Sequence, residues 1–422
     1  MSGNLSLGHE EWSLAKLFAF RIAFVYFLLF CFTPFGAAST FVPWPEAFFA
    51  TWAGIVKWFG KTFFGLSISI LPGGSGDTTF NFVEISVWLL LAFVVTTIWS
   101  ALETKRRSPA RINQLFRMLM RLMLALQLVT YAANKVIPIQ FPRPLQVRLV
   151  QPLGDVPPMA FFWTFMGASP TYIVFTGVLE LLCALLLAFK RTTLAGSLLG
   201  IGILGHVFVL NLCYDIPVKL FSAQLLAIAI LIFAPDCKRI FTTLFARDTA
   251  CSKGFRWWTP QAIMGVVFPT VIIGSSIYFL IQSNTIREKL KIKPPLYGVW
   301  TTTKFELDGD VRPPLLTDAD RWHRLVFDQY YIAARQRMDG SVERFSAEVR
   351  VKEHTITLRG RPQDGPESSE VYSFTQPDEN VLVIEGKWHH LPFQAAMRRD
   401  EGSRFILTNR GFHWINEYPF NR

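Results

Sequence analysis

The sequence has few charged residues and few cysteines, and both shortages limit the class of protein it can be. Only 17% of its 422 residues are Asp, Glu, Lys or Arg, whereas 51% are hydrophobic and 39 are Phe. This composition excludes an ordinary soluble enzyme, because long apolar blocks suit a surface in contact with lipid. The last of the five cysteines is Cys251, so the C-terminal part of the chain is predicted to fold without disulfides.

Patterns that bind metals or nucleic acids are also missing. There is no CxxC pair and no Cys/His spacing typical of a metal site, so we predict no metal ion. The net charge of +11 is unevenly spread, since residues 1–299 contain 25 Lys and Arg against 12 Asp and Glu, and residues 300–422 contain 17 against 19. Because the excess lies in short loops between apolar segments, it indicates membrane orientation and not a nucleic-acid partner.

Long apolar segments are what the sequence has in abundance, and about seven of them are long enough to cross a bilayer. They are Leu14–Phe35, Phe82–Ser100, Gln114–Val136, Tyr172–Phe189, Leu194–Leu212, Val218–Ala234 and Ala262–Ile281. The first contains Arg21 and lacks a small-residue cleavage site, so we expect a retained helix and not a signal peptide. A further segment, Trp44–Leu71, is broken by Lys57 and Lys61. It is interpreted as an interfacial amphipathic helix, with an eighth span as the alternative.

Basic residues predict which way the bundle faces. They concentrate in three loops that fall on one side if the spans alternate, and that side should be cytoplasmic. These residues are Lys105, Arg106, Arg107, Arg111, Lys190, Arg191, Lys238, Arg239, Arg247, Lys253 and Arg256. We therefore expect a multi-pass protein of a bacterial-type inner (plasma) membrane, with an extracytoplasmic (periplasmic) C-terminal domain. The basic run Arg287–Lys293 disagrees with this orientation, although long domains can cross a membrane despite such charges.

After Lys293, apolar and polar residues alternate in short runs that are typical of strands. The predicted strands are Trp300–Glu306, Arg321–Phe327, Tyr330–Arg337, Arg344–Val351, Thr355–Arg359, Val371–Phe374, Val381–Ile384, Phe393–Met397 and Phe405–Leu407. Turns at Asp339-Gly340, Asp364-Gly365 and Glu401-Gly402 separate some of them. The fold class we predict is an α-helical transmembrane bundle over residues 1–290, followed by a soluble, all-β, barrel-like domain over residues 291–422.

Ionisable side chains inside the spans are the candidate functional residues, because each is costly in hydrocarbon unless it is paired or hydrated. Near the cytoplasmic ends, Arg21, Arg117 and Arg121 are interpreted as reaching lipid phosphates. Towards the outer side we predict a polar pocket. Its residues are Tyr131, Asn134, Lys135, Glu180, His206, Asn211, Asp215 and Lys219.

Two interpretations of this polar layer stay open. Glu180 and His206 are predicted at similar depth, where they could meet across a helix interface. Alternatively, Glu180 pairs with Lys135 and Asp215 pairs with Lys219, and both pairs only fix the register of the helices. The neighbouring loop Gln140–Ser169, rich in proline and aromatic residues, is either a lid over the bundle or an interfacial aromatic belt.

Two strings in the third and fourth spans resemble a known family. Tyr131-Ala132-Ala133-Asn134-Lys135 and Gly177-Val178-Leu179-Glu180, the latter opening a helix that ends in Lys190-Arg191, are similar to the DoxX-like membrane proteins over about residues 112–240. The resemblance implies a four-helix membrane bundle. Some members of that family are linked to quinone-coupled sulfur oxidation or to thiol redox systems. This sequence departs from the family by its additional spans and its C-terminal domain.

The start of the C-terminal domain resembles lipocalin-type (calycin) barrels. Gly298-Val299-Trp300 opens the first predicted strand, and the resemblance implies a late arginine stacked on Trp300, for which Arg410 is the candidate. Lipocalin-type barrels hold apolar ligands inside, but Trp300 could equally close the end of a filled barrel. The pair His389-His390 is predicted to lie in a strand, where neighbours point to opposite faces and cannot share a metal.

Spans, polar layer and resemblance together favour a protein that handles a hydrophobic small molecule, a quinone or a lipid, with a redox-linked subunit as one form of this role. Whether it is an enzyme stays open. The residues given roles are Glu180 and His206 for proton transfer, Lys135 and Lys219 for anion or carbonyl binding, and Tyr131, Asn134, Asn211 and Asp215 for contact with the ligand. The alternatives are a non-catalytic assembly module, whose β-domain contacts a partner protein or lipid, and a transporter. No cofactor beyond a quinone or lipid is implied.

Overall fold

The computed structural model describes residues 12–70, 75–103, 109–245, 263–360, 368–401 and 405–420. They form two compact units, one within Met1–Ala133 and Thr176–Leu280 and the other within Asn134–Phe175 and Ile281–Arg422. The second unit therefore combines the C-terminal residues with a segment from the middle of the chain. Some predicted features lie outside the described residues, namely Leu71, Lys105, Arg106, Arg107, Arg247, Lys253, Arg256, Ala262, Asp364-Gly365 and Gly402.

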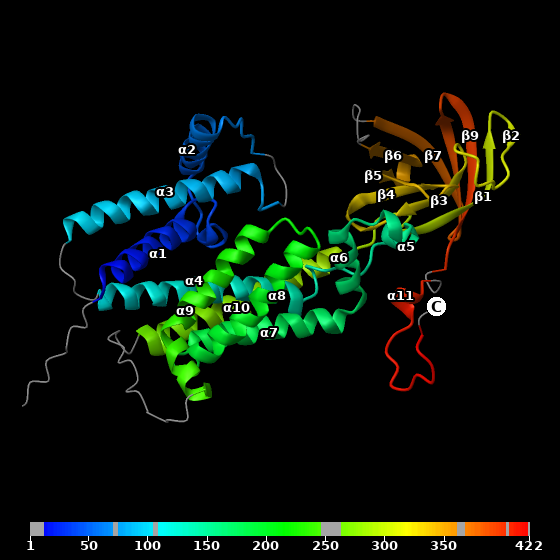
Figure 1. Cartoon of the computed structure of the whole chain (residues 1–422). Helices are drawn as coiled ribbons and strands as arrows, with labels where there is room; N and C mark the ends of the chain where they lie inside the picture. The colour runs from blue at the N-terminus through cyan, green and yellow to red at the C-terminus, as the bar shows by residue number, and fades with distance from the viewer. Residues whose placement is uncertain are drawn as a thin grey trace, which may run out of the picture. The chain divides into compact units, whose positions relative to one another are not determined.

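Helices follow one another from Leu14 to Leu290 (Figure 1). They are α1 (Leu14–Phe32), η1 (Ala37–Thr40), α2 (Glu46–Phe64), α3 (Thr79–Leu102), α4 (Ala110–Val136), α5 (Gln146–Val150), η2 (Leu153–Asp155), α6 (Pro158–Ala168), α7 (Pro170–Ala188), α8 (Thr193–Cys213), α9 (Lys219–Phe245), the π-helical turn η3 (Ile263–Val267) and α10 (Phe268–Leu290). Within the described residues, seven are long and apolar enough to cross a membrane: α1, α3, α4, α7, α8, α9 and α10. They match the seven predicted segments, so the predicted multi-pass helical region is confirmed.

The helix α2 is not one of the seven candidate spans. Pro45 precedes its first turn, and Gly65 ends it in a left-handed conformation at φ +67°. Its buried face includes Trp52, whose indole Nε1 donates a hydrogen bond of 2.6 Å to Glu84 Oε1 of α3. Glu84 is only 1% exposed, and its role was not evident from the sequence. Its carboxylate joins α2 to α3 through a buried polar contact in addition to apolar packing.

The three arginines near the predicted cytoplasmic side bind protein groups, so the interpretation that they reach lipid phosphates is wrong. Arg21 pairs with Glu103 at 2.8 Å. Arg121, which is fully buried, donates to the carbonyl oxygen of Leu187 at 2.6 Å, and Arg117 donates to a carbonyl of α9 at 2.9 Å. The last carbonyls of α7 have no donor within the helix, and a guanidinium satisfies them while complementing the helix dipole.

Antiparallel strands in the second unit form one sheet that closes into a barrel. They are β1 (Gly298–Leu307), β2 (Asp310–Val311), β3 (Trp322–Phe327), β4 (Ile332–Arg337), β5 (Val342–Arg350), β6 (Thr355–Gly360), β7 (Ser368–Asp378), β8 (Val381–Trp388) and β9 (Leu391–Arg399). The order is β2-β1-β3-β4-β5-β6-β7-β8-β9, and β1 also pairs with β9. Since β2 only extends the end of β1, the closed barrel has eight strands, and the predicted barrel-like domain is confirmed.

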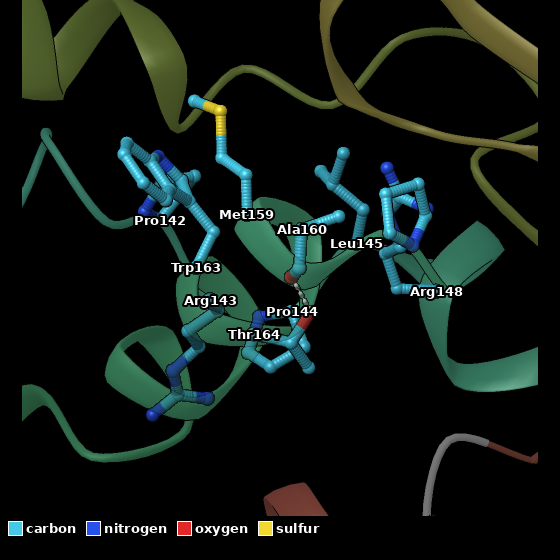
Figure 2. Close-up of a pocket in the computed structure, with 10 residues that line it drawn as sticks. Pro142, Arg143, Pro144, Leu145, Arg148, Met159, Ala160, Trp163 and Thr164 are labelled. Atoms are coloured by element: carbon cyan, nitrogen blue, oxygen red, sulfur yellow. Dashed lines mark hydrogen bonds between the residues drawn. The ribbon is translucent and has the colours of Figure 1, made fainter. Parts of the chain in front are cut away.

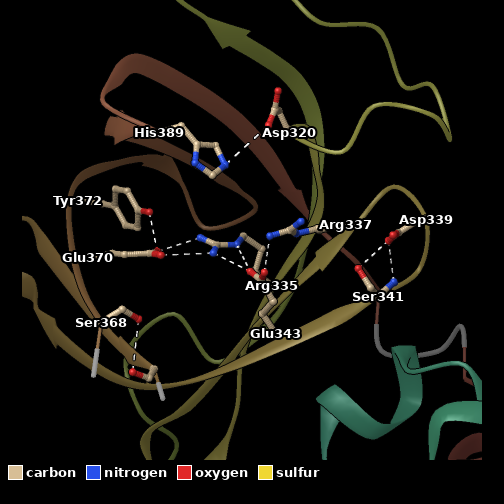
Figure 3. Close-up of polar contacts among 11 residues, drawn as sticks. Asp320, Arg335, Arg337, Asp339, Ser341, Glu343, Ser368, Glu370, Tyr372 and His389 are labelled. Carbon is tan, nitrogen blue, oxygen red and sulfur yellow. Dashed lines mark hydrogen bonds and ion pairs between the residues drawn. The ribbon is translucent and has the colours of Figure 1, made fainter. Parts of the chain in front are cut away.

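Aromatic rings fill the barrel interior and surround the buried Arg335 guanidinium. Figure 3 shows its contacts with Glu343 and Glu370. The Arg335 side chain, 3% exposed, donates to Glu343 at 2.6 Å and to Glu370 at 2.8 Å. It lies 4.0 Å from the ring centroid of Trp388, and the Tyr372 hydroxyl donates to Glu370 at 2.7 Å. Burial disfavours the Arg335 charge, but Glu370 and Glu343 outweigh that cost, so the pKa of Arg335 is raised. The interior is a packed core with compensated charges.

The arginine that stacks on Trp300 is Arg399 and not Arg410, so that prediction is wrong. The Arg399 guanidinium lies 5.8 Å from the Trp300 ring centroid and donates to the Tyr297 carbonyl oxygen at 2.6 Å. Arg399 ends β9, which pairs with the start of β1, whereas Arg410 stacks on Phe420 at 3.9 Å. Strand pairing, invisible in a single sequence, decides which arginine reaches the ring.

Two further details of the predicted strands are wrong. The pair His389-His390 is the turn between β8 and β9, and both residues have positive φ values, 49° and 69°. The predicted strand Phe405–Leu407 is instead the start of a single helical turn, α11 (Ile406–Asn409). The runs Trp388-His389-His390 and Phe405–Leu407 are too short for periodicity to distinguish a strand from a turn or a helix.

Candidate functional site

At the corner between α8 and α9, the predicted site residues serve to hold loops together. Lys219 Nζ pairs with Asp215 at 2.8 Å and lies 3.8 Å from Asp77. The Asp77 carboxylate accepts hydrogen bonds from the backbone amides of Lys219 and Leu220, at 2.8 and 2.9 Å. Asp77 therefore caps the N-terminus of α9 from a loop more than a hundred residues earlier. This geometry supports the structural alternative for Asp215 and Lys219.

Three other predicted ligand-binding residues have partners on neighbouring helices. Asn211 donates to the Ser222 hydroxyl at 2.9 Å, and the Ser283 hydroxyl donates to Asn134 Oδ1 at 3.0 Å. The Tyr131 ring lies against Phe221, with centroids 6.5 Å apart. The two hydrogen bonds satisfy polar groups within the helices, as burial requires.

The two residues of the predicted acid–base pair lie on consecutive helices, α7 and α8. Glu180 is 4% exposed within α7. His206 is exposed on α8, and no hydrogen bond or ion pair joins it to Glu180 in the described chain. Lys135, 7% exposed, lies at the end of α4. The catalytic roles of these residues stay predictions.

A different region of the second unit has the geometry of a built site: the loop between α4 and α7. Its short helix α5 packs on the outer face of the barrel, where Val147 and Val150 join an apolar cluster with Val299, Val326 and Ala334. The segment predicted as a lid or an aromatic belt is thus bound directly to the β-domain. Burial of these aliphatic side chains provides the main stabilisation.

Polar contacts fix α5 in one position on the barrel. The buried Asp328 carboxylate accepts a hydrogen bond of 3.1 Å from the Val147 amide near the start of α5. At the other end, Gln336 donates to the Val150 carbonyl oxygen at 2.8 Å. Gln146 also donates to the Tyr297 hydroxyl at 3.2 Å. Both ends of α5 are therefore satisfied by barrel residues, which compensates for the short length of the helix.

Asp328 gives this attachment a dependence on pH. Burial raises the pKa of Asp328 above its ordinary 3.8, although backbone amide hydrogen bonds oppose the shift. Because the folded pKa is the higher one, the folded state binds the proton more tightly, and the attachment weakens as pH rises from below 3.8 through the raised pKa. The variant Asp328→Asn, which cannot ionise, should lose this trend. Hydrogen exchange of the α5 amides across that pH range tests it, and equal trends in both proteins would contradict it.

A cavity of about 330 Å³ lies between residues 142–148 and the helix α6 (Figure 2). Its lining residues are Pro142, Arg143, Pro144, Leu145, Arg148, Pro157, Met159, Ala160, Trp163 and Thr164. Most are apolar, two carry guanidinium groups and none is acidic. Gly167 lets α6 approach closely, since a Cβ there would lie 2.1 Å from the Pro142 carbonyl oxygen.

The Arg148 guanidinium at this cavity binds a neutral amide, that of Gln151, where a carboxylate would be the usual partner. Arg148 and Arg344 both donate to Gln151 Oε1, at 2.7 and 2.8 Å. Burial and the charge of Arg344 lower the pKa of Arg148. Arg143 is exposed, and no ion pair to it occurs among the residues that the structure describes. The cavity therefore presents two guanidinium groups and no carboxylate beside apolar walls.

This cavity was not predicted from the sequence. The loop Gln140–Ser169 is visibly rich in proline and aromatic residues, but nothing in the sequence indicates that Pro142–Pro144 and Trp163 line one cavity. The repeated prolines were the available hint, because proline stiffens a loop and holds side chains apart.

Comparison with known proteins identifies a similar protein but assigns no activity to it. Over 142 residues the chain is 29% identical to the uncharacterized protein YwoB of Bacillus subtilis (strain 168). The matched stretch covers 32% of this chain and 84% of YwoB. No family model matches the chain. No solved structure matches it. The similarity means that a stretch of this chain resembles most of a separate protein.

Proposed function

We propose that the protein binds an acidic membrane lipid, whose headgroup occupies the cavity between residues 142–148 and 157–164. The observation that supports this most directly is the lining, which combines apolar walls and two guanidinium groups with no carboxylate. An apolar pocket with a few convergent polar groups is the usual form of a small-molecule site. Guanidinium groups bind phosphate and carboxylate through paired hydrogen bonds.

Electrostatics favour an anion over a neutral headgroup. Arg148 and Arg344 share one amide oxygen of Gln151, so neither of these contacts neutralises a charge. Bringing two cations together around a neutral acceptor is unfavourable, and a phosphate would relieve that repulsion. A quinone ring carries neutral carbonyl oxygens and would leave the charges uncompensated. The cavity therefore fits a lipid better than a quinone.

Its position along the chain and its size fit a lipid held at the membrane surface. The loop that builds the cavity connects α4 to α7, two of the candidate spans. A volume of about 330 Å³ is at the small end for ligand pockets. It suits a headgroup, and the acyl chains would remain in the bilayer.

The barrel is proposed as a scaffold for the loop, not as the ligand container. The closed eight-strand order and the stacking of Arg399 on Trp300 support the lipocalin-like resemblance. However, aromatic rings and the Arg335 ion pairs fill the interior. This packing favours the second candidate function, a non-catalytic module that organises the loop and a partner. The redox role implied by the DoxX-like resemblance stays a prediction.

Removal of both lining arginines should reduce the amount of acidic lipid that the protein retains. In Arg143→Gln/Arg148→Gln, each lost charge-assisted contact is expected to weaken binding about tenfold. The measurement is mass spectrometry of lipids that copurify in polymer-bounded membrane discs, normalised to protein.

The matched control is Arg350→Gln/Arg359→Gln, which removes two exposed charges from the barrel surface. That variant should retain as much acidic lipid as the unchanged protein. Equal retention by the lining variant and the control, or retention of a neutral quinone that neither variant alters, would count against the proposal.

A further inference from the structure

Residues 405–420 expose a group of large apolar side chains in a short stretch. Phe412 is 75% exposed, Trp414 90%, Ile415 79% and Tyr418 80%. The segment is folded on itself, since Arg410 donates to Asn416 at 2.7 Å. Soluble proteins rarely expose contiguous apolar residues of this size without a partner.

The start of this segment lies at the end of the barrel where the chain enters from α10. Seven residues, 291–297, join α10 to β1, so β1 begins within about 30 Å of the end of a candidate span even if they are fully extended. The last strand, β9, ends beside the start of β1, where Trp300 pairs with Arg399 and the Asp400 amide donates to the Val299 carbonyl oxygen at 2.8 Å. The chain therefore leaves the barrel beside the point where it entered.

Two more features belong to the same end of the barrel. Phe405, the first described residue of the segment, packs against the apolar cluster that holds α5. The β3–β4 turn at this end carries Tyr330 and Tyr331, which are 45% and 67% exposed. The amide of Val147, near the start of α5, binds Asp328 at the same end of the barrel.

We propose that residues 412–418 bind the interfacial layer of the bilayer in which the helices lie, through Phe412, Trp414, Ile415 and Tyr418. Trp and Tyr prefer the membrane–water interface, where the ring is apolar and its polar atom is hydrated. Between 405 and 420 the formal charges are those of Arg410 and Glu417, which cancel. Binding therefore rests on aromatic burial and is independent of the lipid charge. This inference goes beyond the headgroup site proposed above and does not require it.

Photocrosslinking of the full chain in lipid nanodiscs tests the proposal. Trp414→p-benzoylphenylalanine is compared with Leu316→p-benzoylphenylalanine, because Leu316 is also highly exposed, at 77%, but follows β2 at the opposite end of the barrel. Lipid adducts at residue 414 should exceed those at 316 several-fold. The excess should be the same in phosphatidylcholine discs with or without phosphatidylglycerol, unlike retention at the arginine-lined cavity.

Equal lipid yields at the two positions would overturn the proposal. So would adducts at residue 414 formed mainly with peptides, whether of this chain or of a second protein. Because the Trp414 side chain is almost fully exposed, the substitution removes little packing, and Ile415→p-benzoylphenylalanine provides a second probe in the same layer.

Discussion

Arg335→Ala is expected to accelerate hydrogen exchange throughout the barrel strands by about a hundredfold, which corresponds to about 3 kcal/mol of lost stability. The substitution removes the guanidinium that joins Glu343 and Glu370, which are left facing each other around an apolar core. It also removes the contact with the Trp388 ring at 4.0 Å. The expected loss is at the low end for a broken buried pair because both carboxylates keep some contact with water.

Hydrogen exchange of β4, β7 and β8 in the full chain measures this effect, because the most protected amides report the global opening of the barrel. Arg359→Ala is the control, since Arg359 pairs with Glu348 on the outer surface with 55% of its side chain exposed. An exposed pair contributes less than about 1 kcal/mol. Arg335→Met with Glu343→Gln and Glu370→Gln should recover much of the protection, since the buried charges are removed together and only the partly exposed Arg337 loses its carboxylate. Similar exchange in the Arg335 and Arg359 variants would show that the network is unimportant.

Gly167→Ala is expected to abolish most lipid retention without altering any charge. The added Cβ would lie 2.1 Å from the Pro142 carbonyl oxygen, far inside the ordinary contact range of 3.4–4 Å. Since a backbone carbonyl cannot rotate away as a side chain can, α6 must separate from the Pro142–Pro144 wall. Overpacking of this kind costs about 1–3 kcal/mol, or roughly ten- to a hundredfold in affinity.

Gly154→Ala is the matched control, because it lies in the same loop and a Cβ there meets nothing within 4 Å. It should retain lipid normally. Exchange of the amides near Phe141 should rise only in the Gly167 variant, which separates a local opening of the cavity from a general loss of folding. If Gly167→Ala retained lipid as well as Gly154→Ala, the cavity would not be the binding site.

The span predictions succeeded because hydrocarbon allows few substitutes for a long apolar helix. Segments such as Phe82–Ser100 and Leu194–Leu212 coincide closely with α3 and α8. The barrel strands were equally visible, since inward and outward residues alternate along β5 and β6. Both signals are local, so each can be recognised without knowing what the segment packs against.

The candidate site was predicted less well because it depends on which distant residues meet. Polar residues in the spans were easy to find in the sequence. However, the carboxylate that caps α9 and lies near Lys219 Nζ belongs to Asp77, which is in a distant loop. The contact of Val147 with Val299 joins residues about 150 positions apart through a helix of five residues, too short for a periodic signal. In the sequence, Arg143 and Arg148 could not be distinguished from solvent-exposed charged residues of a loop.

The sequence alone determined that this protein is a multi-pass helical bundle followed by a β-barrel, because helix length and strand alternation are set by the solvent each face meets. Three features became visible only in the folded chain: the barrel is filled, the loop between α4 and α7 is attached to it, and Arg143 and Arg148 line one cavity. Those facts follow from pairing and close approach between remote segments, and such contacts leave no pattern in a single sequence.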